Sequence, residues 1–302
     1  TPTPTLTPCQ PWSNYATFTL KQPSGSNITD FPLLISGTYS FLKTTTNGGS
    51  LRNVNGYDIG FFSDSALQTS MSFQTVFWTG STGGVEYWVR IPTLTSASAT
   101  VIYMAYGNSG ISTDQQTSGS VWDTNYHAVW HYKDGTTLSG LDSTTYRNNL
   151  VFTGSITGPV AGKIDGAVKF NWPQWATASL NLSTGSVLTV ETWYKQTQAW
   201  DTGNELMMEL TSKTNTNAGG FYINPNSSVS GPVMEFGVSN NAPALVNRTY
   251  ATSSNNVWHH HVVTFALVTS PWITNYYLDS VLQTERSHGV GIANGTVFAN
   301  ST

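Results

Sequence analysis

Short runs in which apolar and polar residues alternate recur along the whole chain, and Val85–Ile91 and Val187–Trp193 are two clear examples. A period of two residues is typical of a β-strand with one buried face. The candidate strands are rich in Val, Ile, Tyr, Phe and Trp and are bounded by Gly, Asn, Ser or Pro. They are Ala16–Leu20, Phe31–Ile35, Asp58–Phe62, Glu86–Ile91, Thr100–Tyr106, Ala167–Phe170, Leu188–Tyr194, Glu205–Leu210, Gly220–Ile223, Val233–Val238, His259–Ala266 and Thr274–Leu278. No comparable helical pattern is present, so we predict an all-β protein.

Turn residues separate these strands at intervals of about ten positions, which favours β-sandwiches. A length of 302 residues is typical of two domains. The Ser-, Thr- and Gly-rich stretch Gln115–Thr124 is the predicted boundary. We therefore predict an extended N-terminal arm over residues 1–11, one β-sandwich over residues 12–122 and a second over residues 126–302.

Composition indicates a folded, secreted protein. Charged residues are 9% of the chain and aromatic residues 13%, whereas disordered chains are rich in charge and poor in aromatics. The net charge of −4 with no basic cluster argues against nucleic acid as a partner. No apolar run approaches the length of a membrane span. The chain starts at Thr1 without an initiator Met, which is compatible with removal of a signal peptide. We expect an extracellular location, at the cell surface or in a secreted fibre.

The only cysteine is Cys9, which therefore cannot form an intrachain disulfide. An intermolecular disulfide and a buried thiol are equally open alternatives for it. Covalent glycans are expected, because N-glycosylation sequons occur at Asn27, Asn181, Asn226, Asn247, Asn294 and Asn300. The Thr-Pro run adds O-glycosylation candidates at Thr1, Thr3, Thr5 and Thr7.

A set of motifs in the first 125 residues resembles a domain of unknown function, family 2341, found in microbial surface proteins. In order they are Trp12-Ser13-Asn14-Tyr15, Phe31-Pro32-Leu33, Gly56-Tyr57-Asp58-Ile59-Gly60-Phe61, Trp88-Val89-Arg90-Ile91-Pro92, Tyr103-Met104-Ala105-Tyr106-Gly107-Asn108 and Val121-Trp122. Both their order and their spacing match the pattern of that family. The resemblance implies a β-sandwich and gives no activity.

Later motifs resemble a concanavalin A-like, laminin G-type jelly roll, which often follows such a domain. They are Val129-Trp130-His131, Asp142-Ser143-Thr144, Gly166–Phe170, Thr189–Trp193, Trp258–Val263 and Tyr277-Leu278-Asp279-Ser280. Ser280 stands where the family has Gly. Only 22 residues follow Ser280, so the resemblance implies that the last one or two strands of the jelly roll are missing. If the natural chain continues past Thr302, its own strands would close the sandwich.

No catalytic constellation competes with a structural role, so we predict that the protein is not an enzyme. Glycosidases of this fold need two carboxylates across a cleft. Glu191 stands alone in its strand, and Glu205 and Glu209 are separated by apolar Met207. Nucleophile motifs based on Ser, Thr or Lys and phosphate-binding loops are absent from the sequence.

Metal and sugar sites are also weakly supported. Of His259-His260-His261, alternation along a strand places only His259 and His261 on one face, and two imidazoles with no nearby carboxylate make a poor zinc site. No metal is therefore assigned and no cofactor is expected, with calcium the one possibility. Its candidate ligands are Asp142, Asp165, Asp201 and Asp279. Trp172, Trp175 and Trp200 are candidates for a sugar-stacking platform, with core packing as the simpler explanation.

An open sheet and a spare segment together suggest polymerisation. A missing strand exposes unpaired N–H and C=O groups, which a strand from a neighbour would satisfy. In the arm, Pro2, Pro4 and Pro8 lack amide donors on one edge, while Thr3, Thr5 and Thr7 keep theirs on the other; Leu6 completes the donor segment. The segment Cys9–Leu20 is an alternative donor, and a disordered O-glycosylated stalk is the competing interpretation of the arm.

The leading hypothesis is a structural subunit of an extracellular filament or pilus-like fibre. Copies of the chain would assemble head-to-tail by β-strand donation, and a head-to-tail contact that does not close gives a filament. The second hypothesis is a cell-surface carbohydrate-binding or adhesion module. The third is a glycan-active enzyme, which requires acid pairs that the sequence does not supply.

Overall fold

The computed structural model describes the chain with gaps. The described residues are 12–132, 137–156, 158–164, 166–171, 173–182, 185–197, 208–210, 218–227, 233–239, 246–251, 253–267, 273–288 and 297–298. The protein is all-β, as the sequence predicts, with one four-residue α-helix in this part of the chain. The chain divides into two compact units, Thr1–Ala176 and Thr177–Thr302. Among the described residues no helix is both long and apolar enough to cross a membrane.

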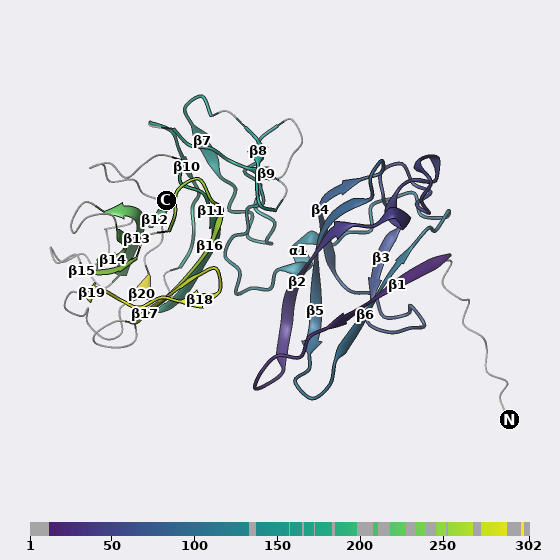
Figure 1. Ribbon diagram of the computed structural model, residues 1–302, viewed down its shortest axis with the longest axis horizontal. Helices are drawn as coiled ribbons and strands as arrows, with labels where there is room; N and C mark the ends of the chain where they lie inside the picture. Colours follow the sequence, from purple (N-terminus) through teal and green to yellow (C-terminus); the bar gives the residue numbers. More distant parts are fainter. Residues whose placement is uncertain are drawn as a thin grey trace. The chain divides into compact units, whose positions relative to one another are not determined.

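The first unit is built on two three-stranded antiparallel sheets (Figure 1). One has the order β1-β6-β3 and the other β2-β5-β4. Their bounds are β1 Asn14–Leu20, β2 Ile28–Thr38, β3 Ile59–Phe62, β4 Phe73–Thr79, β5 Gly84–Leu94 and β6 Thr100–Tyr106. Between β2 and β3 lie two 3₁₀ turns, Ser40–Leu42 and Thr45–Asn47.

The core of this unit lies between the two sheets. Alternate residues of β5 are buried, including Tyr87, Val89 and Ile91, as the period of two predicts. Phe61 of β3 packs against Tyr87, with ring centroids 5.4 Å apart. All four residues of β3 are buried, because Trp12 also covers the outer face by packing edge-on against Phe62. The core therefore joins both sheets into a β-sandwich.

The rest of the first unit is less regular. It contains α1 (Ser118–Val121), β7 (Val151–Thr153), β8 (Val160–Ala161), β9 (Gly166–Ala167) and β10 (Trp175–Thr177). Two small sheets are formed by β7 with β10 and by β8 with β9.

The side chain of Gln74 on β4 links three parts of this irregular segment to the sandwich. Its Oε1 accepts from Trp122 Nε1 at 2.9 Å and lies 3.2 Å from His131 Nε2, while its Nε2 donates to Ser143 Oγ at 2.7 Å. Residues that the sequence assigned to the jelly roll therefore pack in the first unit. As a result, the predicted limits of 12–122 and 126–302 do not coincide with the two compact units.

The second unit also contains two sheets. One has the order β11-β16-β17-β18, and the other β12-β13-β14-β15-β19 with β20 parallel to β13. Their bounds are β11 Val187–Tyr194, β12 Met208–Leu210, β13 Ala218–Ser227, β14 Val233–Ser239, β15 Val246–Ala251, β16 His259–Ala266, β17 Ile273–Leu278, β18 Val281–Leu282, β19 Ser287–His288 and β20 Val297–Phe298.

One hydrophobic core is shared by these two sheets. Phe265 of β16 lies 5.0 Å from Phe221 of β13, and Tyr276 of β17 lies 5.0 Å from Phe236 of β14, between ring centroids. The second unit is therefore also a sandwich. After Ser280, the described residues form three strands of only two residues each, and the predicted lack of a closing strand stays a prediction.

Candidate functional site

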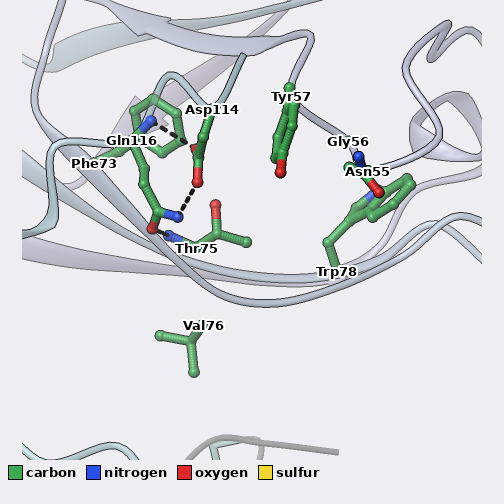
Figure 2. Close-up of a pocket in the computed structure, with 9 residues that line it drawn as sticks. All are labelled: Asn55, Gly56, Tyr57, Phe73, Thr75, Val76, Trp78, Asp114 and Gln116. Carbon is green, nitrogen blue, oxygen red and sulfur yellow. Dashed lines mark hydrogen bonds between the residues drawn. The ribbon is translucent and has the colours of Figure 1, made fainter. Parts of the chain in front are cut away.

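A small pocket in the first unit combines aromatic and polar side chains. Its volume is about 140 Å³, and it lies beside β4 and the loop that precedes β3. The lining residues are Asn55, Gly56, Tyr57, Phe73, Thr75, Val76, Trp78, Asp114 and Gln116. Figure 2 shows the hydroxyls of Tyr57 and Thr75 and the carboxylate of Asp114 around one opening. No pattern in the sequence predicted this pocket, because its residues come from three separate segments.

Hydrogen bonds and close packing fix the walls of the pocket. Gln116 donates through Nε2 to Asp114 Oδ2, and its Oε1 accepts from the Thr75 amide at 3.1 Å. The indole N–H of Trp78 donates to the Leu42 carbonyl at 3.1 Å. Gly56 has a φ of +72°, and a Cβ there would lie 2.8 Å from the Trp78 ring. The pocket is therefore preformed, with an aromatic side and a polar side.

The calcium candidate Asp142 has a structural role in the hydrogen bonding of the first unit. Its fully buried carboxylate accepts from the amides of Val129, Thr144 and Asn148 at 2.8–2.9 Å and from Thr144 Oγ1 at 2.7 Å. These donors occupy both oxygens, so little capacity remains for a cation. Asp165 and Asp201 lie outside the described residues, in which no cluster of three metal-binding side chains occurs.

Only one of the predicted sugar-stacking tryptophans falls within the described part of the chain. Trp175, in β10, is 51% exposed. Trp172 and Trp200 lie outside the described residues, so the proposed platform stays a prediction.

Among the sequons, Asn27 and Asn181 are exposed. The Oδ1 of Asn27 accepts from the amide of Ser96 at 2.9 Å. Asn226 lies in β13 and Asn247 in β15. Outside the described residues are Asn294, Asn300, Cys9 and the whole donor arm with its threonines.

The three adjacent histidines of β16 have different surroundings. His259 Nδ1 lies 2.7 Å from Asp279 Oδ2, and His260 Nε2 lies 2.9 Å from Glu191 Oε1. His261 is buried, with Nδ1 2.9 Å from the Tyr276 hydroxyl. Burial and the charge of His259 lower the pKa of His261 to about 4.

The expectation that these imidazoles have no nearby carboxylate was therefore wrong. Asp279 is 20 residues from His259 in the sequence. The pairing of β16 with β17 brings it beside His259, the first residue of β16. The carboxylate also accepts from the His260 amide at 2.9 Å, and this bond is the main cause that lowers the pKa of Asp279.

Strand β11 forms one edge of its sheet. The Leu267 amide donates to the carbonyl of Ser186, which lies directly opposite it in the register that pairs Val187 with Ala266. Hydrogen-bonded and non-bonded positions alternate in an antiparallel pair. The N–H and C=O groups of Val187, Thr189 and Glu191 therefore point away from β16.

The beginning of this edge is already occupied. The Phe298 amide of β20 donates to the Gly185 carbonyl at 2.7 Å, while β20 also pairs with β13. Beyond that bond, no described strand pairs with the outer edge of β11. Val187, at the start of the strand, is 61% exposed.

Comparison with known proteins identifies part of the first unit. Residues 55–140 match the model of the domain of unknown function DUF2341. The match includes four of the motifs on which the resemblance rests, from Gly56–Phe61 to Val121-Trp122, and it continues past Trp122. No curated protein and no solved structure matches the chain. The similarity of the second unit to concanavalin A-like jelly rolls stays a prediction.

Proposed function

We propose that the chain is a structural subunit of an extracellular filament or pilus-like fibre, assembled head-to-tail by β-strand donation from the arm at residues 1–11. The observation that carries this proposal is the outer edge of β11, which has a strand partner only at its beginning among the described residues. We further propose that the second sandwich is a concanavalin A-like jelly roll whose sheet a neighbour completes.

The chemistry of the β11 edge favours strand addition. It contains no Pro, Lys or bulge, and its one charged side chain, Glu191, lies 2.9 Å from His260 Nε2. Its inward side chains Leu188 and Val190 belong to or pack on the core, which holds the strand in register. An added strand would satisfy the outward backbone groups that run from Val187 to Glu191.

The sequence of the arm fits the donor role. Pro2, Pro4 and Pro8 remove three amides from one edge, so the arm can pair through the other edge while its proline edge resists further growth. Because donor and acceptor surfaces differ, each subunit can bind one neighbour at each end. Cys9, within the arm, would lock such a contact as an intermolecular disulfide.

Electron microscopy of the native chain beside a variant lacking residues 1–11 tests the proposal. We expect filaments from the full chain and monomers from the truncated chain. Compact monomers of both proteins at high concentration would contradict strand donation.

The pocket of the first unit favours a second candidate function, carbohydrate binding at a cell surface. Sugars are bound by aromatic faces together with acidic and amide side chains, and Tyr57, Trp78, Asp114 and Gln116 provide these groups. On a glycan array, Asp114→Ala is expected to abolish binding and Trp175→Ala to leave it unchanged. Loss of binding with Trp175→Ala alone would instead place the sugar on the tryptophan platform.

A further inference from the structure

Three side chains at one end of β16 form a continuous hydrogen-bonded chain. Ser254 Oγ lies 2.9 Å from His259 Nε2, and His259 Nδ1 lies 2.7 Å from Asp279 Oδ2. Ser254 belongs to the loop before β16, His259 is the first residue of β16, and Asp279 is in the turn between β17 and β18. The two bonds use opposite nitrogens of the imidazole, as in the triads of serine hydrolases.

The directions of the protons follow from the partners. The Asp279 carboxylate also accepts from the amide of His260, which holds it in its charged, accepting form. The tautomer of the His259 ring that fits this carboxylate donates from Nδ1, which leaves the lone pair of Nε2 facing Ser254. The Ser254 hydroxyl then donates to Nε2, the arrangement in which the ring can remove the hydroxyl proton.

The position of Ser254 allows a substrate to reach it. Its side chain is exposed, while the His259 side chain is only 13% exposed and is thus held in place. Asn255 follows Ser254, and its backbone N–H makes no hydrogen bond to the described part of the chain. In several hydrolases the amide that follows the nucleophile stabilises the oxyanion.

We propose that Ser254, His259 and Asp279 form an acyl-transfer site that acts on carboxylic esters. Ser254 Oγ attacks the ester carbonyl carbon as its proton moves to His259 Nε2. The bond to the alcohol oxygen breaks, and the alcohol leaves with that proton. Water, deprotonated by His259, then attacks the acyl-serine and releases the carboxylic acid and Ser254.

Ser254 and His259 are the catalytic residues of this site, and Asp279 is a positioning residue that acts through His259. The activity is separate from strand donation. The proposed activity differs from the sequence-based expectation of a protein with no active site. Sequence patterns did not predict it, because strand pairing brings Asp279 to His259 from 20 residues away.

A fluorophosphonate probe and hydrolysis of p-nitrophenyl acetate test the site on the full chain. We expect the probe to label Ser254 of the native protein, as located by peptide mapping, and to leave the heat-denatured protein unlabelled. Ser254→Ala is expected to reduce hydrolysis to the buffer rate, while Ser81→Ala, at another exposed hydroxyl, keeps the native rate.

The variant Asp279→Asn separates catalysis from structure. It keeps an oxygen for the His260 amide, and Asn tolerates the φ of +50° found at this position. We expect kcat to fall by about 10²–10⁴-fold with KM little changed. Equal labelling of native and denatured protein, or native hydrolysis by Ser254→Ala, would overturn the proposal and leave the triad with only a structural role.

Discussion

At the scale of single residues, buried polar side chains have the clearest consequences. Asp142 accepts four hydrogen bonds from residues of two short segments, so it organises the loop that follows Trp122. The substitution Asp142→Asn replaces one accepting oxygen by an NH₂ group and leaves buried donors without an acceptor.

We expect Asp142→Asn to lower the free energy of unfolding by about 2–4 kcal/mol. Chemical denaturation followed by tryptophan fluorescence measures this change. Asp114→Asn, at an exposed carboxylate, is the matched control and is expected to stay within about 0.5 kcal/mol of the native protein. Equal effects of the two substitutions would show that the Asp142 bonds contribute little.

His261 is predicted to make the stability depend on pH. Its pKa falls from the ordinary value of 6.5 to about 4 in the folded protein. Burial is the largest cause, the charges of His259 and His260 act in the same direction, and the charge of Asp279 partly opposes them. Between these values the unfolded chain binds the additional proton, so stability rises with pH through this window and is lost as pH falls.

We expect the native protein to lose about 2–3 kcal/mol more than His261→Gln between pH 7 and pH 4. Urea denaturation at a series of pH values measures the difference. Parallel profiles for the native protein and His261→Gln would contradict the role of His261.

At the scale of elements, the β17–β18 hairpin contains a strained turn. Asp279 and Ser280 have φ values of +50° and +69°, as a two-residue turn of the mirror-image type requires. Ser280 stands where Gly has no steric penalty. We expect Ser280→Gly to stabilise the protein by about 0.5–1 kcal/mol, measured by thermal unfolding. Ser81→Gly, at a turn residue whose φ is not positive, is expected to destabilise it slightly.

The outer edge of β11 is the element on which the assembly proposal depends. Thr189→Pro removes an amide that points away from β16, so the sheet keeps its internal bonds. We expect this variant to remain folded by circular dichroism and to form no filaments by electron microscopy. Thr189→Ala keeps the amide and is expected to polymerise as the native chain does. Normal filaments from Thr189→Pro would exclude this edge as the acceptor.

At the scale of the whole molecule, the first compact unit extends to Ala176. Gln74 holds Trp122, His131 and Ser143 against β4, so a fragment that ends at residue 125 loses two of these three contacts. We expect a fragment of residues 12–125 to unfold at least about 8 °C below a fragment of residues 12–176. A fragment of residues 12–150 keeps these contacts and is expected to match the longer one. Equal melting temperatures for all three would favour the shorter domain limit predicted from the sequence.

Local alternation of apolar and polar residues was sufficient to predict the fold class and many strands, because one face of each strand is buried. Thr100–Tyr106 and His259–Ala266 were predicted with the bounds that the structure has. The strand β15 was missed, because Arg248 interrupts its apolar pattern. In the structure Arg248 is nearly buried and forms an ion pair with Glu285 from a distant segment. Local sequence contains no sign of that partner.

The sequence by itself therefore determined the all-β class, the low charge, the resemblance of residues within 55–140 to a domain family and the alternating prolines of residues 1–8. Only the tertiary structure decided which residues meet: Asp279 with His259 and Ser254, Gln74 with Ser143, and Tyr57 with Asp114 around the pocket. The physical reason is the separation along the chain between the residues that interact. Alternation and turns are properties of neighbouring residues, whereas these contacts form by strand pairing and packing between residues from 20 to about 70 positions apart in the chain.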